Sequence, residues 1–172
     1  MSFLTKLFGK SQDDRVVARP LWHRTVEIAR EKEWYRDCGV ADTVAGRFDM
    51  ITLILSIVMI RMERDAELVE PSVRLTELFV EDMDGQLRES GVGDVVVGKR
   101  MGQLMSVLGG RLGAYREGLT SADEAVMADA VSRNVNLHEG SDPLLVARRA
   151  RAFAAGLDLV PAYRVLDAEI GK

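Results

Sequence analysis

The chain of 172 residues is 47% hydrophobic and 29% charged, which provides enough apolar material for one buried core and excludes an intrinsically disordered protein. Its formal net charge is −4, whereas a nucleic-acid-binding protein usually carries a basic excess. The single cysteine, Cys38, excludes an internal disulfide, and with only His23 and His138 beside it a structural zinc site lacks ligands. Neither histidine has the local signature of a nucleophile site, so we expect no catalytic residue, metal or cofactor.

The N-terminal ten residues, MSFLTKLFGK, lack the long apolar stretch and the cleavage site of a signal peptide. The longest nearly continuous apolar run covers residues 50–60, about half of the ~20 residues that a membrane span needs. We therefore expect a soluble protein that stays in the compartment where it is made. Residues 1–10 are expected to form a short amphipathic segment with weak, reversible membrane contact, or else a frayed terminus, because one face carries Phe3, Leu4, Leu7 and Phe8.

The next elements are predicted to be two helices separated by a connection. Residues 9–11 are expected to form a hinge, and residues 13–33 a helix that breaks or kinks at Pro20. Glycines and aspartates indicate a connection over residues 34–46. Residues 47–69 predict a second helix whose first half is apolar on nearly every side, which is typical of a central, buried helix.

The remaining helices are expected over residues 71–90, 95–118, 122–136, 143–155 and 161–170. Pro71 can begin the first of these, Asp94 can cap the second, and Gly156 is expected to end the fourth. No alternating apolar pattern is long enough to require a sheet. The sequence therefore predicts an all-α protein with one compact multi-helix domain. We expect a helical domain over residues 11–140 with a C-terminal helical extension, residues 141–172, packed on it.

The densest aromatic and charged cluster lies at residues 34–37 and consists of Trp34, Tyr35, Arg36 and Asp37. It could be a loop packed on the core with an Arg–Asp ion pair. It could also be a binding hot spot, since Trp, Tyr and Arg dominate hot spots.

An acidic stretch follows between residues 63 and 94, with ten carboxylates against three arginines. It could be a solvated face or a docking surface for a basic partner. Asp82, Asp84 and Gly85 match two steps of a calcium-binding loop, but its other ligand positions are missing.

The helix expected at 95–118 carries small residues on one side, within about 80° of its circumference, namely Gly98, Gly102, Ser106, Gly109 and Gly113. Each helical glycine costs ~1 kcal/mol relative to alanine, so this glycine stripe needs a reason. Close packing against another helix of the same domain is the first expectation. The alternative is a groove for a partner's helix, flanked by the adaptable Met101 and Met105.

Three segments of the chain resemble the ubiquinol–cytochrome c chaperone family. They are WYRDCGVADTVAGRFDM at 34–50, FVEDMDGQLRESGVGDVVVGKRM at 79–101 and, more weakly, SRNV at 132–135. The chain departs from the family pattern at Ala41, where proline is expected, at Val44 and Ala45, and after about residue 142. The resemblance implies an all-α assembly factor for ubiquinol–cytochrome c reductase, complex III, with no established catalytic residues.

The resemblance also implies partners and a location. The expected client is newly made cytochrome b or another complex III subunit, beside which a small co-chaperone is a further expected partner. The start of the chain shows no transit peptide, so we expect a bacterial protein in the cytoplasm, peripheral on the inner membrane; a mitochondrial member would act on the matrix side. The alternative is a general helical interaction module with another client. The candidate partner-binding residues are Trp34, Tyr35, Arg36, Asp37, Asp82, Asp84, Arg88, Asp94, Gly98, Lys99, Gly102 and Gly109.

Overall fold

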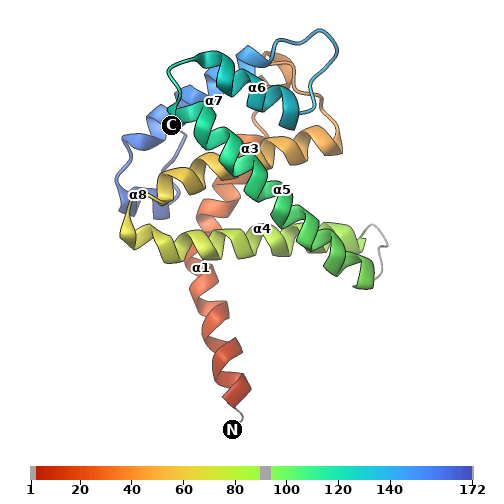
Figure 1. The fold of residues 1–172 in the computed structure, drawn as a ribbon. Helices are drawn as coiled ribbons and strands as arrows, with labels where there is room; N and C mark the ends of the chain where they lie inside the picture. Colours follow the sequence, from red (N-terminus) through yellow and green to blue (C-terminus); the bar gives the residue numbers. More distant parts are fainter. Residues whose placement is uncertain (1–2, 90–93, 172) are drawn as a thin grey trace.

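A computed structural model describes the backbone of residues 3–89 and 94–171 and the side chains of residues 16–85 and 102–171. Figure 1 shows helices packed around α3 (Val44–Met62). The other helices are α1 (Phe3–Ala29), α2 (Lys32–Arg36), a short 3-10 helix η1 (Ala66–Leu68), α4 (Val69–Glu89), α5 (Asp94–Thr120), α6 (Glu124–Asn134), α7 (Pro143–Asp158) and α8 (Ala162–Leu166). The all-α prediction is confirmed, since the described residues contain no strand and only one isolated bridge, between Val40 and Leu137.

The central, buried helix predicted near 47–69 is α3, which packs against α1, α5 and α7. It begins earlier than expected because Thr43 Oγ1 caps it, accepting a hydrogen bond from the Gly46 amide at 3.1 Å. It also ends earlier, at Met62. There the buried Arg61 turns its guanidinium to the carbonyls of Leu157 and Val160, 3.2 and 2.7 Å away, and the polar residues that follow leave the helix.

The first helix corrects two predictions. α1 runs without interruption through residues 9–11, where a hinge was expected, and through Pro20, where a break was expected. Packing against α3 and α4 holds the helix around the proline, with Ala18, Leu21 and Trp22 buried on either side of it. The tertiary contacts offset the hydrogen bond that Pro20 cannot donate. In Figure 1 the N-terminal turns of α1 project away from the other helices.

The end of α1 shows why the helix stops at Ala29. Its terminal carbonyls are satisfied by side chains of α2: Trp34 Nε1 donates to the Ile28 carbonyl at 2.8 Å and the Tyr35 hydroxyl donates to Ala29 at 2.9 Å. The loop after α2 is then fixed by the segment after α6, because the Ala41 amide donates to the Asn136 carbonyl at 2.9 Å. A proline at position 41 would have no amide hydrogen for this bond.

The long helices α4 and α5 are consecutive in the chain, and each extends across the molecule (Figure 1). As predicted, Pro71 lies in the first turn of α4 and the side chains of Leu75, Leu78, Phe79 and Met83 point into the core. The side chain of Leu87, also predicted inward, and the turn at residues 91–93 lie outside the described residues.

The C-terminal helices pack on this framework, α7 against α6 and α3, and α8 against α1. Asp123 caps α6 by accepting a hydrogen bond from the Ala125 amide, and Asp142 caps α7 by accepting one from the Leu144 amide, both at 2.9 Å. α7 continues two residues beyond Gly156, the predicted stop, because that glycine is an ordinary helical position with open space where a side chain would be. The division of the chain near residue 140 stays a prediction.

Candidate interaction surface

The cluster at residues 34–37 divides into a buried part and an exposed part. Trp34 is only 1% exposed and lies under the Arg149 guanidinium, whose carbon is 4.7 Å from the ring centroid. It is therefore a core residue and not an exposed anchor. Arg36 and Asp37 form a bidentate ion pair at the surface, with both N–O distances 2.7 Å. The hydrogen bond from Arg36 lowers the pKa of Asp37.

Part of the acidic stretch is balanced by arginines close to it. Glu63 pairs with Arg116 of α5 at 2.6 Å, and Arg74 reaches two carboxylates of its own helix, Glu70 and Glu77. Asp82 accepts a hydrogen bond at 2.7 Å from Trp22 Nε1 and thereby links α4 to α1. The side chains of Arg88, Asp94 and Lys99 lie outside the described residues.

The glycine stripe faces away from the core. Gly102, Gly109 and Gly113 are exposed, and a Cβ atom added at any of them would meet nothing within 4 Å. The expectation of packing within the domain is therefore wrong for these three glycines, while Gly98 lies outside the described side chains. The close helix crossing is made instead by Gly118, where an added Cβ would lie 2.8 Å from Met127 Cα of α6.

The helical wheel explains why the stripe is open. α5 packs on α3 through a face that contains the buried Leu108 and Tyr115. At 100° per residue the stripe is centred about 130° around the helix from this face. Met105, which is 40% exposed, borders the stripe. The periodicity thus identified the glycine face of α5 correctly, but a different face of the helix packs into the core.

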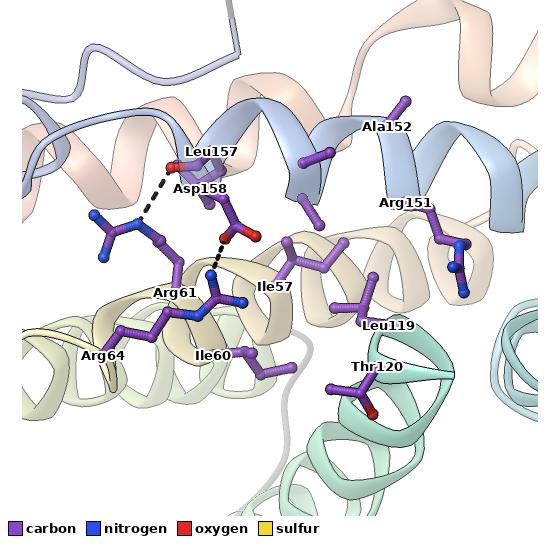
Figure 2. Close-up of a pocket in the computed structure, with 12 residues that line it drawn as sticks. Ile57, Ile60, Arg61, Arg64, Leu119, Thr120, Arg151, Ala152, Leu157 and Asp158 are labelled. Atoms are coloured by element: carbon purple, nitrogen blue, oxygen red, sulfur yellow. Dashed lines mark hydrogen bonds and ion pairs between the residues drawn. The ribbon is translucent and has the colours of Figure 1, made fainter. Parts of the chain in front are cut away.

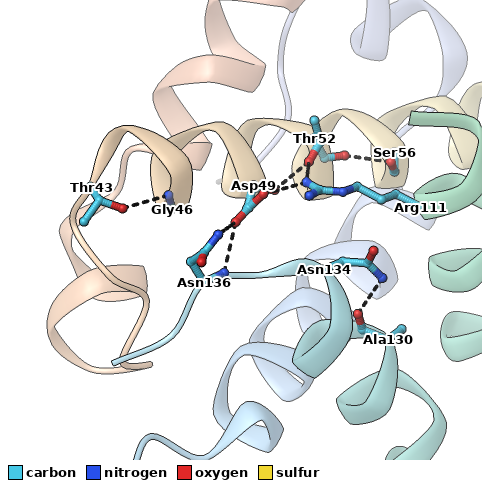
Figure 3. Close-up of polar contacts among 9 residues, drawn as sticks. All are labelled: Thr43, Gly46, Asp49, Thr52, Ser56, Arg111, Ala130, Asn134 and Asn136. Carbon is cyan, nitrogen blue, oxygen red and sulfur yellow. Dashed lines mark hydrogen bonds and ion pairs between the residues drawn. The ribbon is translucent and has the colours of Figure 1, made fainter. Parts of the chain in front are cut away.

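A buried polar network fixes α5 in this orientation (Figure 3). Asp49 of α3 is 3% exposed and lies 2.8 Å from Arg111 Nη1 of α5. Its other oxygen accepts hydrogen bonds from the backbone and side-chain nitrogens of Asn136, the backbone bond being 3.0 Å long. Arg111 Nη1 also donates to Thr52 Oγ1 at 2.7 Å. The network ties together α3, α5 and the segment after α6.

Sequence reasoning missed this network, although one signal was present: Asp49 interrupts the most apolar helix of the chain. A charge in such a position needs a partner. The partners are 62 and 87 residues further along the chain, and no local pattern indicates which they are.

A cavity of about 390 Å³ lies between α3, the end of α5 and α7 (Figure 2). Its apolar wall includes Ile57, Ile60 and Leu119. The charged side chains at its rim already have partners within the protein. Arg64 pairs with Asp158 at 2.7 Å, and Arg151 donates hydrogen bonds to the carbonyls of Gly118 and Ser121 at the end of α5. The cavity therefore offers apolar contact and no evident pair of reacting groups.

The Cys38 thiol is poorly suited to act as a nucleophile. It is buried, and burial raises its pKa, which disfavours the reactive thiolate. Within the described ranges no cluster of three or more His, Cys, Asp or Glu side chains is placed to hold a metal ion. Over the same residues no helix is both long and apolar enough to cross a bilayer.

The fold defines the class of protein: an all-α domain with an open glycine face on α5. The family model described as ubiquinol–cytochrome C chaperone matches residues 36–168, and the chain belongs to this family. The crystal structure of the Cbp3 homolog from Brucella abortus is similar, with a TM-score of 0.81 and 26% identity over 99% of this chain and 96% of that one. A search of the curated proteins found no significant match.

Proposed function

We propose that this protein is an assembly chaperone for ubiquinol–cytochrome c reductase that binds newly made cytochrome b and shields its hydrophobic helices. The family match and the likeness to the Cbp3 homolog support the class of function. The observation that carries the choice of client is the open glycine stripe of α5. A chaperone with this client would act at the surface of the membrane that receives cytochrome b, on the cytoplasmic side in a bacterium.

The stripe suits a transmembrane helix for a physical reason. Small residues let two helix backbones approach closely, which is how transmembrane helices pack against one another. The stripe costs the isolated domain ~1 kcal/mol for each glycine, and no contact within the described chain uses the missing side chains at Gly102, Gly109 or Gly113. A partner helix would use them, and Met105 would adapt to its side chains.

Charged residues among the candidate partner-binding residues form the proposed margin of this client surface, that is, its border beside the glycine stripe. Asp84, Asp94, Arg88 and Lys99 belong to α4 and α5, and their charges would contact the loops between client helices. Cytoplasmic loops of membrane proteins are rich in Lys and Arg, so carboxylates would attract them. Arg36 and Asp37 remain proposed contacts, whereas Trp34 and Asp82 would act through packing and through the bond to Trp22.

The test is client capture by a variant with a blocked stripe. Gly102→Leu and Gly109→Leu place bulky side chains in open space, so both variants should fold and melt no lower than the parent protein. Gly156→Leu is the matched control, because Gly156 is also a helical glycine with nothing within 4 Å of an added Cβ. Each variant is expressed with a tagged chaperone, and co-purified cytochrome b is quantified.

We expect both stripe variants to lose at least about tenfold of the captured cytochrome b, while Gly156→Leu keeps it, since a leucine separates backbones that must touch. Undiminished capture by two folded stripe variants would remove the stripe from the client surface. If the parent protein captures a different protein and no cytochrome b, the function becomes that of a general helical interaction module.

A further inference from the structure

A second surface feature lies at the opposite end of α1 from its projecting N-terminus. It is a cleft of about 590 Å³ formed where α1 ends, α2 passes and α3 begins. Four of the side chains that line it are cationic, namely Arg30, Lys32, Arg36 and Arg47. Tyr35 and His138 complete the wall, and Asp42 is the only carboxylate among the described residues that line it.

The charges in this basic cleft do not balance. Arg36 is neutralised by Asp37, and Arg47 pairs with Asp42 at 2.7 Å. No carboxylate of the described chain pairs with Arg30 or Lys32, both of which are exposed. Two positive charges are therefore left over beside an open space.

The neighbouring carboxylates show why these two cations stay unpaired. Glu27 pairs with Arg24, on the preceding turn of α1. Glu31 and Glu33 both point to Arg149 of α7, at 2.8 and 3.9 Å. Every acidic residue close in sequence to Arg30 and Lys32 is thus directed to another arginine, outside the cleft.

The cleft also offers hydrogen-bond donors. A guanidinium has five N–H groups, so Arg36, which uses two of them on Asp37, and Arg47, which uses one on Asp42, keep donors for a ligand. Tyr35 lines the cleft together with Arg30 and Arg47. Burial and Asp42 raise the pKa of Tyr35, and Arg47 and Arg30 oppose that rise.

We propose that this basic cleft binds a phosphomonoester dianion. Two unpaired cations match a doubly charged group, whereas one carboxylate would leave a positive charge unbalanced. Guanidinium groups also suit the geometry of phosphate oxygens and bind them through charge-assisted hydrogen bonds. The phosphate group has two sources with the same chemistry, a free phosphomonoester or the headgroup of phosphatidic acid. This inference goes beyond the proposed chaperone function and does not depend on the client.

The test measures binding of inorganic phosphate to the full chain by isothermal titration calorimetry, at constant ionic strength set with chloride. The double variant R30Q/K32Q removes the two unpaired charges. The control R19Q/R148Q removes two exposed positive charges elsewhere, from α1 and α7. A third variant, R30K/K32R, keeps the charge of the cleft. Thermal melting and circular dichroism establish that all of them are folded.

We expect saturable phosphate binding that R30Q/K32Q weakens by at least about tenfold, since two charge-assisted contacts are lost. R19Q/R148Q and R30K/K32R should bind within about threefold of the parent protein. A second measurement compares sedimentation with phosphatidylcholine vesicles that contain or lack phosphatidic acid. Vesicle binding that depends on phosphatidic acid and on Arg30 and Lys32 assigns a lipid headgroup, and its absence beside phosphate binding assigns a free phosphomonoester.

The proposal is overturned if the folded parent protein shows no saturable phosphate binding at millimolar concentration. It is also overturned if both charge-removing variants weaken binding equally, because net charge alone would then explain the effect. Binding of an acidic peptide in the absence of phosphate binding would assign the cleft to a protein partner and contradict the proposal. Capture of cytochrome b is not used in any of these measurements, so their failure leaves the chaperone function untouched.

Discussion

At the scale of single residues, the arginines connect the helices of this molecule. Arg111 joins α5 to Asp49 of α3, and Arg61 joins α3 to the carbonyls of Leu157 and Val160. Arg149 covers the ring of Trp34 and pairs with Glu31. A buried ion pair does little for net stability, but the loss of one partner leaves a buried charge uncompensated. The orientation of α5, and with it the exposure of the glycine stripe, rests on the Asp49–Arg111 pair.

We predict that Arg111→Met lowers the free energy of unfolding by about 3–5 kcal/mol, because it leaves the carboxylate of Asp49 buried and short of one partner. Urea denaturation measures the change. Arg116→Gln is the control, since it breaks an ion pair, about half exposed, between α5 and Glu63, the residue that follows α3, and should cost less than about 1 kcal/mol. If Arg111→Met costs no more than Arg116→Gln, the buried pair does not fix α5.

At the scale of the elements, α5 contains glycines with two different roles. Gly109 is in open space, whereas Gly118 lies against Met127 at the crossing with α6. The first loses backbone entropy on folding with no gain inside the domain. The second permits a helix contact that a side chain would prevent.

We therefore predict opposite effects of the same substitution. Gly109→Ala should raise the free energy of unfolding by about 0.5–1 kcal/mol, because alanine is the better helix former. Gly118→Ala should lower it by about 1–3 kcal/mol through overpacking against Met127. Thermal denaturation followed by circular dichroism compares the two variants. A loss of stability in Gly109→Ala would mean that the stripe is packed in the folded domain.

The elements also show how far the sequence predicts the structure. α3 and α4 were predictable because apolar periodicity and Pro71 are local features. The uninterrupted α1 was not, because contacts with α3 and α4 decide whether a helix tolerates Pro20. Periodicity located the glycine stripe but not its exposure, which depends on the face that packs on α3. Among the candidate residues, Trp34 could be an exposed binding anchor or a core residue, and the sequence does not distinguish the two; its burial in the structure does.

At the scale of the whole molecule, the proposed contacts lie in different places. The N-terminal turns of α1 project away from the helices around α3 (Figure 1). The basic cleft lies where α1 ends. The glycine stripe lies along α5, on the side away from α3. Arg36 is the one residue proposed both as a client contact and as part of the cleft. Variants of residues 2–9, of the glycine stripe, and of Arg30 and Lys32 leave it unchanged, so membrane contact, client binding and anion binding can be altered separately.

We predict that deletion of residues 2–9 lowers partition of the protein into vesicles without changing its melting temperature by more than a few degrees. These residues include the apolar Phe3, Leu4, Leu7 and Phe8, and such a short face gives weak, reversible membrane binding. Vesicle sedimentation and thermal melting of the same preparations measure both quantities. Equal partition with and without the segment would show that it is only a helical extension.

The last prediction concerns the salt dependence of client capture, a property of the charge on the whole surface. The variant Asp84→Asn/Asp94→Ser removes two carboxylates from the proposed margin. Serine at position 94, where α5 begins, keeps a side-chain oxygen that can cap the helix. Asp129→Asn/Glu139→Gln is the control, with the same change of charge at two exposed residues of α6 and of the segment that follows it. We expect the margin variant to capture several-fold less cytochrome b at low ionic strength, because its attraction for basic client loops is weakened.

At about 0.5 M salt, where the Debye length falls to roughly 4 Å, surface charges are screened and the parent, margin and control proteins should capture similar amounts. The margin variant should therefore show a flatter dependence on salt than the other two. Equal salt dependence in all three folded proteins would remove the carboxylates at 84 and 94 from the client surface. The apolar stripe would then have to hold the client without electrostatic guidance, and capture should persist at high salt as long as Gly102 and Gly109 are unchanged.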